Sequence, residues 1–340
     1  MTENKFLRFG VIGAGRIGKI HAENLATRIP GVEVAVIADV DLKAAQETAK
    51  RLHIPAALAD YQAILADPTI DAVAICSSTD THASIIIEAA KAGKHIFCEK
   101  PIAHDLARID AALEAVRQAG VKLQVGFNRR FDPNFAHIRE MVAQGKVGEP
   151  QILRITSRDP APPPVSYIKV SGGMFLDMTI HDFDMARFLI GSEVTEVYTA
   201  AGVMVDPEIG EAGDVDTAVI TLRFANGAIG TIDNSRKAVY GYDQRVEVFG
   251  SSGMVQAYNN TPHNDIYANA DGVVSAKPLY FFLERYSESF VAELRSFVKS
   301  IRDGSPTPVT GMDGRIPVVI GMAARKSYLE NRPVKISEIG

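Results

Sequence analysis

Short apolar runs alternate with longer stretches of helical spacing along the first 127 residues. The apolar runs are rich in β-branched residues and predict buried strands. One runs from residue 7 into a glycine turn, and the others lie over 32–40, 71–78, 95–100 and 121–127. Between them the apolar residues recur every three or four positions, which predicts helices over 16–29, 42–53, 82–92 and 106–119. Strands that alternate with helices indicate βαβ units. We therefore expect residues 1–127 to form a doubly wound α/β domain on a parallel sheet.

The pattern changes after residue 127. Helical spacing over 133–144 is followed by strand-like runs at 151–158, 194–205, 216–224, 228–236, 243–250 and 253–258. Asn226-Gly227 joins two of these runs and is a strong hairpin signal, and Ser251-Ser252-Gly253 indicates another turn. Helices are predicted again over 283–301 and 314–329. Residues 128–340 are thus expected to form an α+β domain built on a large, mostly antiparallel sheet.

A glycine-rich turn follows the first predicted strand. Gly13, Gly15 and Gly18 have the spacing G-x-G-x-x-G, with Arg16 and Ile17 inside the turn. The first glycine permits the tight turn, the second lets a pyrophosphate approach the backbone, and the third allows close helix–strand packing. The helix N-terminus then offers N–H groups to the phosphates. A simple packing turn is the alternative, but the strand before it and the helix after it favour a dinucleotide site of the Rossmann type.

An acidic residue ends the second predicted strand. Asp39 stands where a carboxylate bonds the 2′-hydroxyl of the cofactor ribose, and the same carboxylate repels a 2′-phosphate. This favours NAD over NADP, although Arg16 in the glycine turn would tolerate a phosphate.

A lysine stands at the end of a later strand, in HIFCEKP (95–101). The nicotinamide ring is expected beyond the carboxyl ends of the parallel strands, and Lys100 lies at such an end, with the rigid Pro101 after it. A solvated surface lysine is the alternative.

A histidine with acidic neighbours lies in the second domain, in GGMFLDMTIHDFDMARFLIG (172–191). Helical spacing puts Asp177, His181 and Asp184 on one face of a helix that Gly191 ends. A histidine with a carboxylate one turn away is a candidate acid–base centre, and a buried core histidine or a metal site are the alternatives. No third or fourth ligand is evident nearby in the sequence, so we predict no metal.

Lys100, Asp177 and His181 suit the oxidation of a secondary alcohol. The reaction needs a base for the hydroxyl proton and an acceptor for the hydride. NAD would accept the hydride and neutral His181 the proton, while Asp177 would orient the imidazole. Lys100, as a cation beside the same oxygen, would stabilise the developing alkoxide.

Charge and cysteine content narrow the partners and the compartment. The formal charge is −5, without a lysine- or arginine-rich block, which argues against nucleic acid or an anionic membrane as a partner. Cys76 and Cys98 both end apolar runs, as expected for buried thiols in a reducing compartment. The N-terminus lacks a signal-peptide pattern, and the apolar runs fall short of the ~20 residues that span a bilayer. We therefore expect a cytoplasmic protein.

Together these motifs resemble the family of glucose-fructose oxidoreductase, inositol dehydrogenase and related sugar dehydrogenases. The resemblance covers nearly the whole chain. It is carried by GVIGAGRIGKIHAENL, IADVD, CSSTDTHASIIIEAAKAGKHIFCEKP, GFNRRFDP and GGMFLDMTIHDFDMARFLIG. The order of the E-K-P and D-x-x-x-H elements is specific to that family, and RDPAPPPVSYIKVSGGMFLDMTIHDFDMARFL looks like its bacterial inositol dehydrogenase branch.

The resemblance implies oxidation of myo-inositol to 2-keto-myo-inositol (scyllo-inosose) with NAD. Lys100, Asp177 and His181 match the family's catalytic positions, and Asp39 matches its NAD-selecting acid. The residues implied to line the cofactor are Ser77, Ser78, Thr79, His82, Glu99 and Lys100. The residues implied to contact substrate hydroxyls are Lys100, Asp177 and His181, with Arg130, Asp159 and Tyr240 as further candidates.

The resemblance also implies an assembly and leaves alternative functions open. Members usually form tetramers through the open face of the second domain's sheet, so we expect a homotetramer. Dehydrogenases for scyllo-inositol or an aldose share the same motifs. Some members of this fold are non-enzymatic regulators that sense NAD(P), but such a protein could lose the lysine or the histidine, and this chain keeps Lys100 and His181.

Overall fold

The computed structural model describes residues 6–340. These residues form two compact units, one comprising the chain up to Asn128 together with Glu288–Ile316, and the other comprising Arg129–Ser287 and Pro317–Gly340. From the sequence we assigned every residue after 127 to the second domain. The segment 288–316 differs from that assignment because Leu294, Phe297 and Val298 are buried in the core of the first unit.

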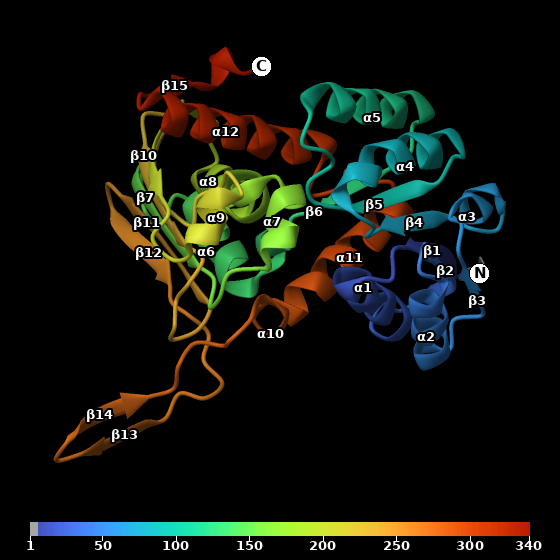
Figure 1. Cartoon of the computed structure of the whole chain (residues 1–340), viewed down its shortest axis with the longest axis horizontal. Coiled ribbons are helices and arrows are strands. Elements are labelled where there is room, and N and C mark those ends of the chain that lie inside the picture. The colour runs from blue at the N-terminus through green and yellow to red at the C-terminus, as the bar shows by residue number, and fades with distance from the viewer. Residues whose placement is uncertain (1–5) are drawn as a thin grey trace. The chain divides into compact units, whose positions relative to one another are not determined.

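The first unit is built on a parallel sheet with the strand order β3-β2-β1-β4-β5-β6 (Figure 1). Its strands are β1 (Leu7–Ile12), β2 (Val32–Ala38), β3 (Ala56–Leu58), β4 (Ala72–Ile75), β5 (His95–Glu99) and β6 (Leu123–Gly126). Every neighbouring pair runs parallel. The predicted doubly wound Rossmann sheet is confirmed, and its central strand β4 is buried at every position, as expected for a sheet covered on both faces.

Aspartate side chains cap the first turns of some helices of the first unit. They are α1 (Arg16–Thr27), α2 (Leu42–Leu52), α3 (Gln62–Ala66), α4 (Thr79–Lys91), α5 (Leu106–Ala119) and α11 (Ser287–Asp303). The side chain of Asp41 accepts the N–H groups of Lys43 and Ala44 at the start of α2, and Asp105 accepts that of Arg108 at the start of α5. The short elements β3 and α3 were not predicted, because three and five residues carry too little periodicity.

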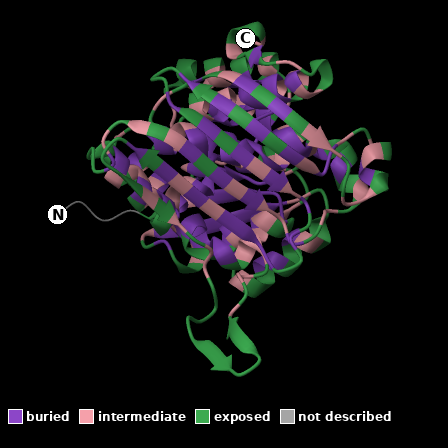
Figure 2. Cartoon of the chain, turned by 90° about the vertical axis from the view of Figure 1, so that its left-hand side faces the viewer, coloured by how far each residue is buried: buried purple, intermediate pink, exposed green. Residues whose placement is uncertain are grey.

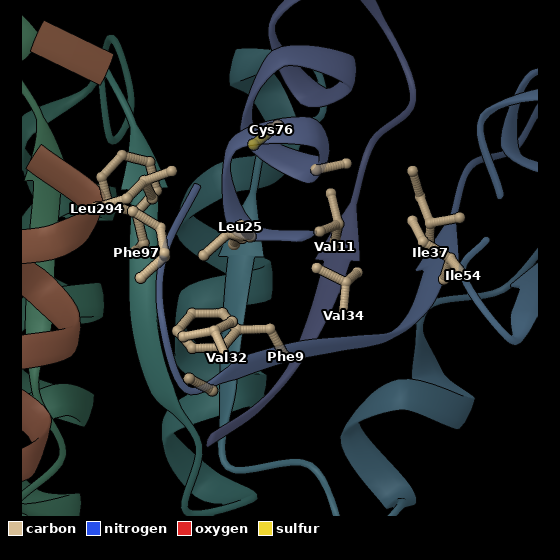
Figure 3. Packing of buried hydrophobic residues seen from close by; sticks show 14 of the residues in the cluster. Phe9, Val11, Leu25, Val32, Val34, Ile37, Ile54, Cys76, Phe97 and Leu294 are labelled. Atoms are coloured by element: carbon tan, nitrogen blue, oxygen red, sulfur yellow. The ribbon is translucent and has the colours of Figure 1, made fainter. Parts of the chain in front are cut away.

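The core of the first unit lies between this sheet and its helices. Phe9 and Val11 of β1 pack with Leu25 of α1, and Figure 3 shows Leu294 of α11 beside Phe97 of β5. The ring of Phe297, also on α11, meets the rings of Phe9 and Phe97 at centroid distances of 6.1 Å each. These aromatic contacts attach α11 to the first unit.

The second unit is built on a mixed sheet with the strand order β12-β11-β7-β10-β9-β8-β15. Its strands are β7 (Pro150–Arg158), β8 (Val194–Gly202), β9 (Thr217–Phe224), β10 (Ile229–Ser235), β11 (Asp243–Gly250), β12 (Gly253–Ala257) and β15 (Val334–Lys335). Only β7 and β10 pair in parallel among its described strands. The mostly antiparallel sheet and the Asn226-Gly227 hairpin between β9 and β10 are therefore confirmed.

Helices cover one face of the second sheet. The helices of this unit include α6 (Pro133–Ala143), α8 (Ile180–Ile190), α10 (Phe282–Arg285) and the part of α12 (Gly311–Glu330) from Pro317 onward. Shorter helical segments are η1 (Asn128–Phe131), α7 (Val165–Ser171), η2 (Met174–Met178), α9 (Pro207–Glu211) and η3 (Ile336–Glu338). The single helix predicted over 283–301 is wrong, because Tyr286 leaves helical geometry and separates α10 from α11. A hairpin of β13 (Ile266–Asn269) and β14 (Gly272–Ser275) extends from this unit and was not predicted (Figure 1).

The two faces of the second sheet differ in character. Inward side chains such as Leu153, Leu222 and Ile232 are fully buried, and along each strand they alternate with exposed positions, as Figure 2 shows. The inward row becomes polar where the parallel strands end: Ser157 follows Ile155 on β7, and Asn234 follows Ile232 on β10, all of them buried. Within residues 6–340 no helix has the length and apolar character that a bilayer crossing requires.

Candidate active site

The glycine turn between β1 and α1 has the geometry of a phosphate cradle. Gly13 has φ +110°, and a Cβ there would lie 2.5 Å from the carbonyl oxygen of Cys76. A Cβ on Gly18 would lie 2.1 Å from the carbonyl oxygen of Gly13. Gly15 is different, because a Cβ there would meet no described atom within 4 Å, so the space beside it is open. These residues fit a bound dinucleotide. Gly13 and Gly18 close the turn, and Gly15 leaves room at the N-terminus of α1.

Asp39 lies directly beside this turn. Its Oδ2 accepts the N–H of Ala14 at 2.5 Å, and its Oδ1 accepts the N–H of Asp41 at 2.8 Å. The carboxylate is partly exposed, whereas Arg16 and Gly15 are exposed and Ile17 is half-buried. The structure therefore brings Asp39 together with the glycine turn, where an acid is suited to a ribose hydroxyl.

The segment after β4 is held by a buried histidine. The two ring nitrogens of His82 lie 2.8 Å from the carbonyl oxygen of Pro101 and 3.0 Å from that of Ser77. Burial lowers the pKa of the His82 imidazole. The hydroxyls of Ser77 and Thr81 lie 2.7 Å apart, while Ser78 is exposed and Thr79 is half-buried at the start of α4. His82 thus joins the ends of β4 and β5. Ser77, Ser78 and Thr79 lie at the same edge of the sheet and are at least partly exposed.

Lys100 follows the last residue of β5. Its side chain is partly exposed, its backbone N–H donates to Oε2 of Glu99 at 3.2 Å, and the Lys100-Pro101 peptide is cis. Glu99 is buried, and its Oε1 lies 2.7 Å from Nε2 of His21. Lys100 therefore lies at the same edge of the sheet as Ser77 and Asp39.

Asp177 and His181 lie in two different helical segments of the second unit. Gly172 and Gly173 have φ +89° and +74°, η2 is a π turn closed by the N–H of Thr179 on the carbonyl oxygen of Met174, and α8 begins at Ile180. The single regular helix predicted over 172–191 is wrong, because 174–178 form a π turn, whose hydrogen bond spans one residue more than that of an α-helix, and α8 begins only at Ile180. Asp177 is partly buried and accepts the hydroxyl of Tyr167 at 2.9 Å.

Asp184 forms an ion pair with Arg130. The Arg130 guanidinium donates to both carboxylate oxygens of Asp184, at 2.6–3.1 Å, and both side chains are largely buried. Arg130, a predicted substrate contact, is thereby anchored on α8, the helix that carries His181.

The polar floor of the second unit consists of the inward residues at the ends of β7 and β10. Asn234 donates to Asp182 at 2.9 Å, and Arg129 donates to Asp182 at 2.5 Å. Asp159 follows β7, and burial raises the pKa of its carboxyl to about 6 against the opposing charges of Arg236 and Arg129. Asp159 and Asp177 thus share a charged neighbour, Arg236.

Tyr240 bonds to a different set of residues from those described above. Its hydroxyl donates to Asp243 at 2.6 Å and accepts from Arg158 at 3.2 Å. With Arg158 and Asp233 it lines a shallow hollow of about 310 Å³. Arg158 and Asp233 occupy the register positions of the outward face, so the structure places Tyr240 on that side of the sheet.

The sequence analysis missed three residues near Asp177. Arg236 and Tyr167 contact Asp177, and Asp214 pairs with Arg236. A signal for Arg236 was present. The inward positions of β10 are 230, 232 and 234, and the next is 236, so an arginine continues a row that begins with glycine and isoleucine. Asp214 and Tyr167 lie in segments without periodicity and carry no comparable signal.

The comparisons with known proteins agree with this geometry. Residues 7–127 match the family described as an oxidoreductase family with an NAD-binding Rossmann fold, and residues 135–256 match the GFO/IDH/MocA C-terminal domain. The chain is 52% identical to myo-inositol 2-dehydrogenase of Thermotoga maritima, over 98% of this chain and 99% of the relative. It is 47% identical to inositol 2-dehydrogenase of Rhizobium meliloti, over 97% and 99%.

A solved relative carries ligands. The crystal structure of scyllo-inositol dehydrogenase from Lactobacillus casei with bound NAD(H) and scyllo-inositol is similar with a TM-score of 0.91 at 30% identity, covering 98% of this chain and 100% of that one. The chain thus belongs to the GFO/IDH/MocA family of oxidoreductases, and its cofactor is NAD.

Proposed function

We propose that this protein is an NAD-dependent inositol 2-dehydrogenase that oxidises myo-inositol to 2-keto-myo-inositol. The observation that carries the proposal is the 52% identity to a myo-inositol 2-dehydrogenase over nearly the whole of both chains. The Asp39 carboxylate beside an open glycine turn supports the NAD half of the reaction.

Two side chains are proposed to act on the reacting hydroxyl, and a third orients one of them. Bound NAD supplies the acceptor for the hydride. His181 takes the hydroxyl proton as a neutral imidazole, and Asp177 orients it and stabilises the imidazolium that forms. Lys100 stabilises negative charge on the oxygen as the proton leaves. Arg130 and Asp159 are proposed to bind other hydroxyls, supported by their fixed positions near α8 and Arg236; for Tyr240 the same role is a proposal that rests on the resemblance.

Oxidation of scyllo-inositol is the second candidate. It is favoured by the similarity to the scyllo-inositol dehydrogenase of Lactobacillus casei. The two substrates differ only in the orientation of one hydroxyl, so the same lysine, aspartate and histidine serve both.

A polyol panel tests the proposal. NADH formation is followed by absorbance with myo-inositol, scyllo-inositol, glucose and sorbitol, with NAD or NADP as cofactor. We expect the highest kcat/KM with myo-inositol and NAD. A higher value with scyllo-inositol would favour the second candidate, and no turnover with any cyclic polyol would contradict both.

We also propose a homotetramer that buries the outward face of the second sheet. This face carries Val219, Ile229 and Phe249, each between 42% and 52% exposed. The β13–β14 hairpin exposes further apolar side chains. Because an isolated hairpin is only marginally stable in water, this one is suited to packing against another subunit. Light scattering is expected to give four times the 36.7 kDa of one chain, and Val219→Lys with Ile229→Lys should give smaller particles. A monomeric wild type would contradict the proposal.

A cytoplasmic role in inositol breakdown completes the proposal. Cys76 and Cys98 are both free and buried, which suits a reducing compartment. Cell fractionation with the activity assay tests the location, and growth of a deletion strain on inositol tests the role.

A further inference from the structure

Arg236 is a buried arginine that the proposed chemistry does not use. It follows β10, and its residue is 1% exposed, among the largest fully buried side chains. Its Nη1 lies 3.8 Å from Oδ2 of Asp177, and its Nη2 lies 3.7 Å from Oδ2 of Asp214. Within residues 6–340 its Nε and Nη2 make no hydrogen bond. The guanidinium is therefore held by the charges around it more than by close hydrogen bonds.

Packing alone does not account for an arginine at this position. A guanidinium that leaves water loses its hydration, and a buried ion pair is often replaced by apolar side chains without loss of stability. The carboxylates of Asp177 and Asp214 lie within 4 Å of this cation, and its charge also acts on the carboxyl group of Asp159. The charge of Arg236 therefore has a use that an apolar residue could not supply.

Asp214 connects Arg236 to the turn that carries Asp177. Both oxygens of Asp214 accept the N–H of Met174, at 3.0 and 2.9 Å, and Met174 begins η2. Gly173 is needed beside it, because a Cβ there would lie 2.7 Å from Oδ1 of Asp214. Arg236 thus acts on Asp177 twice, by direct attraction and through the backbone of its turn.

Asp159 completes the arrangement on the other side. Its N–H donates to the carbonyl oxygen of Ser235 at 2.9 Å, and its carbonyl oxygen accepts the N–H of Ala238 at 2.7 Å, so Asp159 is bonded to the chain on both sides of Arg236. The attraction of Arg236 and of Arg129 opposes the burial that raises the pKa of Asp159 to about 6, whereas the charges of Asp177 and Asp182 act in the same direction as the burial.

We propose that Arg236 is a positioning residue of the acid–base site, whose buried guanidinium fixes the carboxylate of Asp177 toward the reacting polyol and attracts that of Asp159. The proposal rests on the proposed function, in which Asp177 serves His181. In this proposal Arg236 acts through these carboxylates and not directly on the reacting hydroxyl or the hydride.

The test compares Arg236→Gln, which removes the charge, with Arg236→Lys, which keeps it. Arg236→Gln is expected to lower kcat by about one to two decades, as for loss of one electrostatic contact at a reacting centre, and to change KM for NAD little. Arg236→Lys is expected to recover part of this loss. The control is Arg285→Gln, since Arg285 is also buried in the second unit but pairs with Asp132. That variant should lower the melting temperature without lowering kcat.

A second measurement needs no substrate and so separates this proposal from the proposed function. Without Arg236 the pKa of the Asp159 carboxyl should rise further. The protein then loses more of its free energy of unfolding as the pH rises and this carboxyl ionises. The melting-temperature loss in Arg236→Gln should be larger at about pH 8 than at about pH 5. The Asp159→Asn background should remove that part of the difference.

The outcomes decide the proposal whichever polyol the enzyme oxidises. A kcat for Arg236→Gln within twofold of wild type would overturn the positioning role. A melting-temperature loss that is equal at both pH values would overturn the charge contact with Asp159. If the wild type oxidises no polyol, the proposed function fails, and the stability measurement still judges the contact.

Discussion

The imidazole of His21 is hydrogen-bonded to the carboxyl group of Glu99, with Nε2 2.7 Å from Oε1. The ring is fully buried between Phe97 and Phe290, at centroid distances of 4.9 and 5.7 Å. The other oxygen of Glu99 accepts the backbone N–H of Lys100 at 3.2 Å. A buried polar pair therefore fixes the end of β5, immediately before the lysine that we propose to be catalytic.

A second acid, Glu293 of α11, lies beside this pair. Oxygen atoms of Glu99 and Glu293 and a nitrogen of His21 all lie within 4.8 Å of one another. Glu293 is fully buried, and within residues 6–340 its carboxyl oxygens make no hydrogen bond. Burial, together with the charge of Glu99, raises the pKa of Glu293 well above its ordinary value.

The first prediction is that Glu293→Gln stabilises the protein at neutral pH. A carboxyl whose pKa is higher in the folded than in the unfolded state favours folding most at low pH, below the unfolded pKa of about 4.3, and loses that advantage as the pH rises through the folded pKa. Glutamine has the same shape and no proton to lose. The melting temperature of Glu293→Gln should thus exceed that of wild type by more at about pH 8 than at about pH 5.

Glu288→Gln is the control for that experiment. Glu288 lies on the same helix and pairs with Arg28, but its side chain is 69% exposed, so its substitution should change the melting temperature little at either pH. If Glu293→Gln were instead less stable at every pH and the wild type held one equivalent of a metal by elemental analysis, His21, Glu99 and Glu293 would be metal ligands and the prediction would be wrong.

The second prediction concerns the charge of Lys100. Lys100→Met keeps most of the apolar stem and removes the cation. We expect NAD to bind nearly as before, measured by fluorescence titration, and turnover to fall by about two to four decades. Lys91→Met, at an exposed position of α4, should change neither quantity. Retention of more than half of kcat in Lys100→Met would show that the lysine is an ordinary surface residue.

The third prediction concerns the choice of cofactor. The Asp39 carboxylate is fixed beside the glycine turn by its bonds to the N–H groups of Ala14 and Asp41. Wild type should have a much higher kcat/KM with NAD than with NADP, and Asp39→Ser should reduce that ratio because it removes the charge that repels a 2′-phosphate. Asp41→Asn, two residues away at the N-cap of α2, should leave the ratio unchanged. Equal use of both cofactors by wild type would refute the role of Asp39.

Local signals in the sequence predicted much of the fold. Helix α5 was predicted with its observed bounds, because Asp105 caps its start and Gly120 takes a left-handed conformation at its end. The Asn226-Gly227 turn likewise fixed the β9–β10 hairpin. Such features depend on residues that lie next to each other in the chain.

The remaining features depend on residues that are distant in the chain. The π turn at Asp177 is anchored by Asp214, and the helix that was expected to continue the second domain packs through Leu294 and Phe297 in the first unit. Periodicity shows that α11 has an apolar face but not which sheet that face covers. The inward position of Arg236 could be read from the alternation along β10, but its acidic neighbours could not, because they lie far before it in the chain, at 159, 177 and 214.

The last prediction concerns the base. His181 can accept a proton only as a neutral imidazole, so polyol oxidation should rise with pH through the neutral range. A carboxylate at Asp177 favours the imidazolium, whereas a cation at Lys100 disfavours it. Asp177→Asn should therefore move the acidic limb of the kcat/KM profile to lower pH and reduce its maximum.

His181→Ala gives the decisive profile. It should remove the acidic limb and most of the activity, measured as a pH–rate series in the oxidative direction at saturating NAD. His137→Ala, at an exposed position on α6, is the matched control and should leave the profile unchanged. If the acidic limb persists unchanged in His181→Ala, another group accepts the proton. Lys100 would be the first to examine, because it is the other titratable side chain that we propose to act on the reacting oxygen.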